Sequence, residues 1–370
     1  MSVKIFVMTH KKFNSPADPT YVPLHVGRAC AQDLGYLGDD TGKNISQKNR
    51  YYSELTGLYW AAYNETDADY IGLCHYRRFF LSDEGRLLSE NEYKQMLEKA
   101  DVILPKPIYH GNAYCEVYKE AHNIFDLNMT GEVIREKYPE MYPVFCEIIS
   151  ADKVYSGNLF VTSRNLFCEY ADWLFSVFDE VEKRIDVEAY DAYHRRVFGF
   201  LSEQLLYVWV KSRGLKICER PVGLTQEKAE TIELKQALCD MVSEGTLDGV
   251  QEALAMFRTT MKDRPDLMLG ASDFSGELAD MFRVLYVCEQ ELSAGQRGMF
   301  AITTDLFMLV RHYRLLCQIA RNISQGADSP QERSYFKDSC VSEPLLSVMI
   351  GNNPDLKAAQ QSLKALTAPV

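Results

Sequence analysis

The chain has 370 residues, of which 46% are hydrophobic and 12% aromatic, and it carries a formal net charge of −12. This length exceeds what one hydrophobic core usually organises, so we expect a main domain and an appended one. The acidic balance excludes a general nucleic-acid binder, because such proteins neutralise phosphates with a broad basic surface.

The ten cysteines are scattered, with no Cys-x-x-Cys pair and no metal-ligand spacing with histidine. We interpret them as reduced, mostly buried thiols of a cytoplasmic protein. The apolar start at residues 1–8 is too short for the hydrophobic region of a secretory signal, and no apolar run approaches membrane-spanning length. Any membrane association would therefore be peripheral, at the inner face of the cell membrane.

The first predicted strand is Val3–Met8, and a polar, basic loop beginning Thr9-His10-Lys11 follows it. The loop after the first strand of an α/β domain is a common place for a nucleotide to bind. The alternative is an ordinary surface turn.

A helix is predicted from Asn49, which can serve as its N-cap, and its apolar positions recur at helical spacing: Leu55, Leu58, Tyr59 and Ala62. The short turn Asn64–Asp67 leads to a second strand, Tyr70–Cys74, which is apolar enough to be covered on both faces. Strand, helix and strand in this order predict a βαβ unit, so the two strands should be parallel neighbours.

Three basic side chains, His75, Arg77 and Arg78, follow the end of this second strand. Ligands of open α/β sheets bind at the carboxyl ends of the strands, and clustered cations there suit a phosphate or diphosphate. In the alternative interpretation the arginines pair with nearby acids such as Glu54.

The middle of the chain continues the α/β pattern. Asp101–Pro105 is a further short strand, and the aromatic stretch 111–141 is either a substrate lid or a packed helical excursion. A strand over 154–162 is broken by Ser156-Gly157-Asn158, and a long amphipathic helix follows it.

A second helix begins at Gly199 and carries Glu203, and residues 215–222 form the last predicted strand. Glu203 is either a first-turn acid favoured by the helix dipole or an active-site carboxylate. Composition then shifts, and residues 226–366 show helical spacing that predicts a bundle of about five or six helices. This region lacks a catalytic cluster, so we expect it to serve oligomerisation or docking, for instance on a membrane assembly complex.

Several segments together resemble the family of glycosyltransferases from bacterial capsule and exopolysaccharide gene clusters, long classed as a domain of unknown function. They are Val3–Phe13, Asn44–Ser46, Tyr52–Trp60, Tyr70–Arg78 and Gly199–Leu206. The resemblance covers about residues 3–225. It implies a GT-A-like, Rossmann-type mixed sheet flanked by helices in residues 1–225, followed by an all-α region in residues 226–370.

The resemblance also implies site residues. Thr9, His10 and Lys11, with His75, Arg77 and Arg78, would bind the donor. Ser156, Gly157 and Asn158 would contact donor sugar or acceptor, and Glu203 would be the catalytic base. If Glu203 is instead only a helix-start residue, another carboxylate such as Asp191 or Asp172 must be the base.

One feature departs from the GT-A pattern. The position of the acidic Asp-x-Asp motif, which holds a divalent metal in typical members, corresponds here to Leu73–Arg78 and has no carboxylate. We therefore expect no metal ligand and no required cofactor, with arginines neutralising the diphosphate, although Mn²⁺ or Mg²⁺ use stays open. A third hypothesis is a metal-dependent enzyme with Asp39, Asp40 or Asp69 as ligands.

The function implied is transfer of a hexose, with galactofuranose or galactose as examples, from a UDP-linked or related donor to a capsular, exopolysaccharide or lipid-linked glycan. The alternative is a non-catalytic module that binds nucleotide-sugars or glycans. The sugar, the acceptor, the stereochemistry and a homo-oligomeric state stay open.

Overall fold

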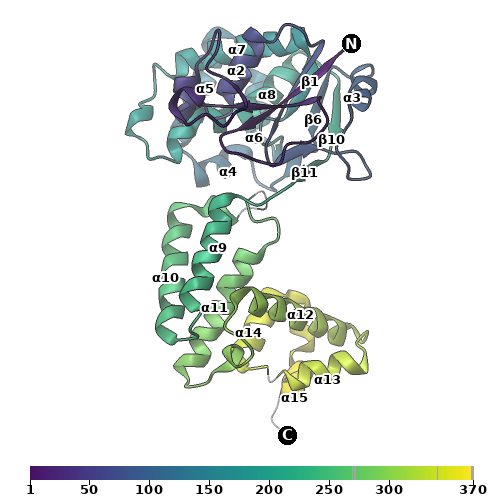
Figure 1. Cartoon of the computed structure of the whole chain (residues 1–370), viewed down its shortest axis with the longest axis vertical. Helices are drawn as coiled ribbons and strands as arrows, with labels where there is room; N and C mark the ends of the chain where they lie inside the picture. Colours follow the sequence, from purple (N-terminus) through teal and green to yellow (C-terminus); the bar gives the residue numbers. More distant parts are fainter. Residues whose placement is uncertain (269, 271, 340, 368–370) are drawn as a thin grey trace. The chain divides into compact units, whose positions relative to one another are not determined.

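The computed structural model describes residues 1–268, 270, 272–339 and 341–367. The chain divides into two compact units, Met1–Thr225 and Gln226–Val370, which Figure 1 draws as an α/β unit and an all-helical unit. None of the helices described is both long enough and apolar enough to cross a membrane.

The first unit is built on a mixed sheet, which has nine strands among the described residues. Seven of them follow the order β10-β6-β9-β4-β1-β2-β3, while β5 pairs with β4 and β11 pairs with β5. The strands are β1 (Val3–Thr9), β2 (Tyr21–His25), β3 (Leu37–Gly38), β4 (Tyr70–His75), β5 (Arg78–Phe80), β6 (Val102–Pro105), β9 (Phe160–Ser163), β10 (Ile217–Arg220) and β11 (Val222–Leu224). A separate two-stranded sheet joins β7 (Ile108–Tyr109) and β8 (Lys153–Val154).

The central strands β1 and β4 pair in parallel, from Val3 opposite Tyr70 to Met8 opposite His75. This pairing confirms the predicted βαβ unit. Both strands end at the same edge of the sheet as a consequence.

Side chains alternate between the two faces of this sheet, as the period of a strand requires. Phe6 and Met8 of β1 pack in the larger core with Leu73 of β4, whereas Ile5 and Cys74 pack in a smaller core on the opposite face. The central strands are therefore buried on both faces, which confirms the interpretation drawn from their apolar run.

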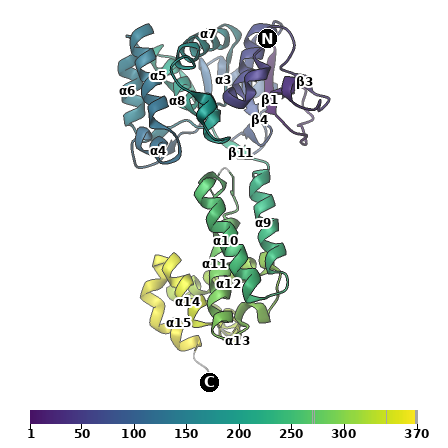
Figure 2. The same ribbon diagram turned by 90° about the vertical axis from the view of Figure 1, so that its left-hand side faces the viewer.

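Helices cover both faces of the sheet (Figure 1). They are α1 (Asn49–Tyr52), α2 (Leu55–Asn64), α3 (Glu90–Leu97), α4 (Tyr114–Ala121), α5 (Ile124–Lys137), α6 (Tyr142–Ser150), α7 (Arg164–Val181) and α8 (Val197–Ser212). Residues of α2, α5, α7 and α8 belong to the larger core, and α3 contributes to the smaller one. Figure 2 shows α5 and α6 side by side next to α8, and these helices are in contact.

Two predicted segments take a more specific form in the structure. The single helix expected from Asn49 is broken into α1 and α2 at Ser53, whose φ of 48° cannot continue a right-handed helix. The stretch 111–141 folds into α4 and α5, which corresponds to the packed helical excursion.

The second unit contains seven α-helices among the described residues, rather than the five or six predicted. They are α9 (Ala229–Val242), α10 (Leu247–Asp263), α11 (Glu277–Ser293), α12 (Leu306–Gln325), α13 (Pro330–Asp338), α14 (Glu343–Asn352) and α15 (Gln360–Thr367). The prediction missed helices because α13 and α15 have only nine and eight residues, too few for a clear period.

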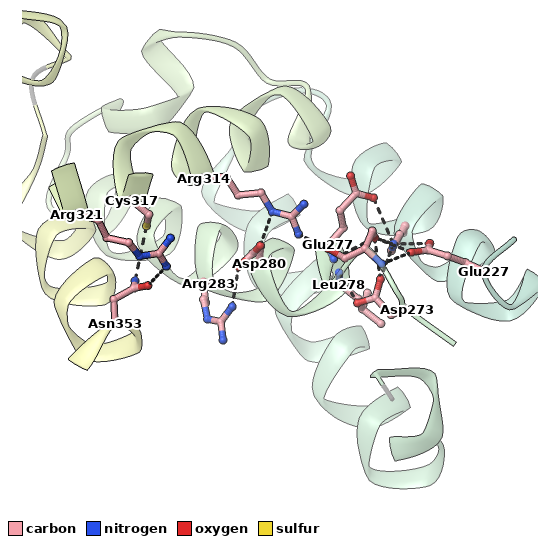
Figure 3. Close-up of polar contacts among 12 residues, drawn as sticks. Glu227, Asp273, Glu277, Leu278, Asp280, Arg283, Arg314, Cys317, Arg321 and Asn353 are labelled. Atoms are coloured by element: carbon pink, nitrogen blue, oxygen red, sulfur yellow. Dashed lines mark hydrogen bonds and ion pairs between the residues drawn. The ribbon is translucent and has the colours of Figure 1, made fainter. Parts of the chain in front are cut away.

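Ionic contacts join the helices of this unit (Figure 3). Asp280 lies between Arg283 and Arg314, with an oxygen 2.6 Å from each guanidinium. Lys235 is buried, and its ammonium lies 2.7 Å from Asp273 and 2.6 Å from Glu227. A buried charge such as that of Lys235 requires such partners, so its ion pairs serve the packing of the bundle.

The nine cysteines within the described residues are free thiols. Only Cys74, Cys288 and Cys317 are buried, while Cys30 is exposed and the other five are half-buried. The expectation of mostly buried thiols is therefore wrong for these nine, because most lie on helix or strand faces that reach the surface. Cys340 lies outside the described residues.

Gly72 of β4 generates a prediction about the sheet. A Cβ built on Gly72 would lie 2.6 Å from Ile5 Cδ1, 2.7 Å from Val161 Cγ2 and 3.1 Å from the Phe160 carbonyl oxygen. We expect Gly72→Ala to destabilise the first unit by about 1 to 3 kcal/mol through overpacking, measured by urea denaturation.

The matched control is Gly351→Ala in α14, where a Cβ meets no atom within 4 Å. Its stability should stay unchanged or rise slightly, because alanine favours a helix over glycine. Equal stability of Gly72→Ala and the unaltered chain would contradict the close packing of β1, β4 and β9.

Candidate functional site

The candidate site lies at the edge of the sheet where β1 and β4 end. The loop after β1 turns sharply, because Thr9 Oγ1 donates to the Lys11 carbonyl at 2.5 Å and accepts from the Lys11 backbone N–H at 3.2 Å. The ring of His10 packs edge-on against the ring of Tyr76, with 5.5 Å between the two ring centres. The Lys11 ammonium lies 5.7 Å from the centre of the Tyr76 ring. The structure thus brings the two predicted donor-binding segments together through Tyr76.

The chain reverses directly after β4, so that His75 pairs with Arg78 across a tight antiparallel turn. The side chain of Arg77 is largely buried at 9% exposure, whereas Arg78 is half-buried. Arg78 makes no salt bridge with a described residue, although it acts electrostatically on the groups around it. Arg78 is therefore the better placed of the two arginines to meet an anionic ligand.

A turn before β9 closes the site from the other side. His75 Nε2 lies 2.6 Å from the Gly157 carbonyl oxygen. Gly157 has a φ of 92°, which favours glycine, and a Cβ there would lie 2.7 Å from Arg78 Nη1. Gly157 and Asn158 are thereby placed against the end of β4, while Ser156 is half-buried beside them.

Glu203 reaches the same site from α8. The helix begins at Val197, so Glu203 lies in its second turn, and the alternative of a first-turn acid is wrong. Burial raises the pKa of Glu203 to about 7, with Glu54 adding to the rise, whereas Arg78 and a hydrogen bond from the Gly157 backbone N–H lower it. A carboxylate with such a pKa exchanges protons near neutral pH.

His75 has the opposite perturbation. Burial lowers the pKa of His75 well below its ordinary value, with the positive charge of Arg78 acting in the same direction and Glu54 opposing it. The imidazole is therefore neutral at pH 7 and does not supply the cation predicted for it. Since Nε2 faces the Gly157 carbonyl, the neutral ring donates a proton there and helps to fix the turn.

Two charged residues of the site were not among those predicted for it. Glu54 accepts a hydrogen bond from Asn158 Nδ2 at 2.6 Å, and Arg196 donates to Ser53 Oγ at 3.2 Å and lowers the pKa of Glu203. The sequence held a signal for Arg196, because His194-Arg195-Arg196 is a basic run directly before α8. In the fold, Arg196 contacts Ser53, the residue at which the predicted helix is broken. The sequence pattern did not predict this break.

Other predicted carboxylates have different partners. Asp172 accepts a hydrogen bond from Tyr63 and Asp191 contacts His194, and both contacts lie at the exposed surface. Asp39 is buried and accepts from the backbone of Gly27 and from Thr56 Oγ1 at 2.6 Å.

The metal hypothesis on Asp39, Asp40 and Asp69 finds no support in this geometry. Asp40 pairs with Arg28 at 2.7 Å, and Asp69 accepts from the Ser2 backbone at the opposite end of β4. In the part of the chain that the structure describes, no three histidine, cysteine or acidic side chains gather in a way that could hold a metal ion.

A surface cavity of about 500 Å³ lies elsewhere on the first unit, lined by residues of α3 and β10 such as Glu92 and Arg220. None of the predicted site residues lines it. Its walls carry charges of both signs, and neither Glu203 nor any histidine lines it. The only carboxylates among its lining residues with a shifted pKa, Glu84 and Glu92, are shifted downward, so they cannot hold a proton near neutral pH as Glu203 can.

Comparison with solved structures identifies the class of the fold. The chain is similar to the apo structure of WbbM, a bifunctional glycosyltransferase, with a TM-score of 0.57 and 30% sequence identity. The similarity covers 62% of this chain and 46% of that one, so it spans less than half of WbbM. The α/β unit thus has the GT-A-like fold of a glycosyltransferase, which confirms the predicted fold class.

The family follows from a family model that matches residues 4–214, more than half of the chain. The chain belongs to the family named Domain of unknown function (DUF4422). A search of curated proteins gives no match.

The raised pKa of Glu203 predicts a pH-dependent stability. The folded state binds this proton more tightly than the unfolded chain does. Deprotonation of Glu203 therefore lowers the free energy of unfolding as the pH rises from about 4.5 to about 7. Glu203→Gln lacks that penalty, so it should exceed the unaltered chain in unfolding free energy by about 1 to 3 kcal/mol at pH 8. Urea denaturation at pH 8 and pH 5 measures the difference.

The difference should shrink at pH 5, where Glu203 is protonated in the fold. Glu116→Gln, which removes an exposed carboxylate of α4, serves as the control and should show no such pH dependence. A Glu203→Gln variant with the same stability change at both pH values would contradict the buried, protonated carboxyl.

Proposed function

We propose that the chain is a glycosyltransferase that uses a nucleotide-sugar donor, with the donor diphosphate at the edge formed by β1 and β4. The observation that carries the proposal is Glu203, a carboxylate with a pKa near 7, beside Arg78 at this edge. The GT-A-like fold and the similarity to a bifunctional glycosyltransferase support it.

Arg78 has the chemistry for the donor side. Its guanidinium carries no salt bridge with a described residue and stands next to the glycine turn at residue 157. A guanidinium fork binds a diphosphate through charge-assisted hydrogen bonds and stabilises the charge that develops as the diphosphate leaves. His10 and Lys11 both contact the ring of Tyr76, two residues before Arg78 in the chain.

Glu203 has the chemistry for the acceptor side. As general base it takes the proton of an acceptor hydroxyl while the hydroxyl oxygen bonds to the anomeric carbon. The bond between that carbon and the diphosphate oxygen breaks, and the nucleoside diphosphate leaves with the electron pair. A base with a pKa near 7 is about half deprotonated at neutral pH, and it is basic enough to accept the proton of the acceptor hydroxyl.

The finer assignment rests on the family resemblance. We propose a hexose donor, with UDP-galactofuranose or UDP-galactose as first candidates, and a capsular, exopolysaccharide or lipid-linked glycan as acceptor. We further propose that the reaction needs no metal, since arginines can neutralise the diphosphate, and that it takes place in the cytoplasm at the membrane face with assembly proteins nearby.

The donor role of Arg78 can be measured directly. Arg78→Ala should weaken binding of the nucleotide-sugar by about 1.5 to 3 kcal/mol, the value of a hydrogen bond to a charged group. Isothermal titration calorimetry reports the affinity. The control is Arg184→Ala, which removes a guanidinium that pairs with Glu136 outside the site, and unchanged donor affinity in folded Arg78→Ala would refute the diphosphate assignment.

The roles of Glu203 and of metal are tested by turnover. Glu203→Gln should bind donor almost normally and lose about a hundredfold or more in kcat, the usual scale of general-base assistance. Transfer by the unaltered chain should persist in EDTA. Near-normal kcat in the glutamine variant would exclude Glu203 as the base, and loss of activity in EDTA with rescue by Mn²⁺ would exclude the metal-free mechanism.

A further inference from the structure

The turn before β9 has an unusual backbone. Asn158 has a φ of 53°, in the left-handed region that non-glycine residues seldom adopt, and it follows Gly157 with a φ of 92°. Asn158 is also buried, with 4% of its surface exposed. Such a conformation costs about 1 to 3 kcal/mol and persists only where surrounding contacts enforce it.

The contacts that enforce it come from the side chain of Asn158. Its Nδ2 donates to Glu54 Oε1 at 2.6 Å and to the Gly199 carbonyl at 3.1 Å, and Ser202 Oγ lies 2.9 Å from its Oδ1. Both amide protons are therefore used within the protein. The side chain anchors the turn on the first two turns of α8, the helix that carries Glu203.

The anchored turn presents its backbone to the two perturbed groups of the site. The Gly157 carbonyl oxygen lies 2.6 Å from His75 Nε2, and the Gly157 backbone N–H hydrogen-bonds the carboxylate of Glu203. The φ angles at 157 and 158 set the directions of these two groups. A change at Asn158 would therefore reach Glu203 without removing any atom that touches it.

We propose that Asn158 is a positioning residue, which holds the backbone of Gly157 against His75 and Glu203 rather than binding substrate itself. The proposal rests on the proposed transferase function for its catalytic meaning. It replaces the direct substrate contact expected of Asn158, because no proton of its amide is left to donate to a sugar.

The consequence concerns the proton of Glu203. The hydrogen bond from Gly157 stabilises the ionised carboxylate and lowers its pKa against the effect of burial. If the turn relaxes and this bond is lost, the pKa of Glu203 rises further. The acid limb of the kcat profile then moves to higher pH, because the base must lose its proton to act.

The test uses the full chain with the variant Asn158→Gly. Glycine adopts a φ of 53° without strain but lacks the amide, so the fold should survive while the anchor is lost. Carbon-13 NMR of the glutamate carboxyls, with the signal of Glu203 assigned by its absence in Glu203→Gln, gives the pKa without any turnover. We expect an upward shift of about 1 pH unit, the scale of one lost hydrogen bond to a carboxylate, and the same shift in the acid limb of kcat.

Two further variants sharpen the result. Asn64→Gly removes an asparagine that also makes several hydrogen bonds, to Lys43 and Trp60 outside the site, and should leave Glu203 unmoved. Ser202→Ala removes one bond of the anchor and keeps the backbone at 158, so it should shift the Glu203 titration upward by less, and it decides the matter if Asn158→Gly does not fold.

A Glu203 titration that stays in place in these anchor variants would overturn the positioning role. A titration that moves in a chain with no transferase activity towards any nucleotide-sugar would support the positioning role and overturn the proposed function. The two claims therefore fail separately.

Discussion

The parallel pairing of β1 with β4 is the constraint on which the site depends. Because Met8 lies opposite His75, and the Tyr76 backbone N–H donates to the Met8 carbonyl at 3.1 Å, both strands deliver their following loops to one edge of the sheet. The register is enforced by alternate side chains packing into separate cores on the two faces, since a shift by one residue would exchange those faces. Packing of the apolar strands thus decides where the polar residues meet.

The pKa values at the candidate site are set by burial and by charged groups of both signs that lie close together where β1 and β4 end. The whole chain is acidic, yet Arg78 and Arg196 stand here with Glu54 and Glu203. Burial pushes the carboxyl of Glu203 and the imidazole of His75 towards their neutral forms, so the site is less charged at neutral pH than its residue types suggest. A diphosphate entering it would meet the guanidinium of Arg78, which forms no salt bridge with a carboxylate of the described residues.

The sequence predicted the features that depend on local pattern. The buried strand Tyr70–His75, its parallel partner and the helix that carries Glu203 follow from apolar periodicity and from the resemblance. Features that depend on single backbone angles or on long-range contact were missed. Hydrophobic spacing predicts neither the break at Ser53 nor the left-handed turn at Asn158. Arg196 and Glu54 reach the site because α1 packs against both α2 and α8, a long-range contact that the local pattern does not contain.

The central claim is that the chain transfers a sugar rather than only binding one. The most direct measurement is release of nucleoside diphosphate from a panel of nucleotide-sugars, UDP-galactose and UDP-galactofuranose among them, with and without glycan acceptors, alongside thermal shift as a readout of binding. The account predicts release from at least one donor, accelerated by an acceptor hydroxyl. Binding of a nucleotide-sugar with no release under any acceptor would contradict it and would identify the chain as a non-catalytic binding module.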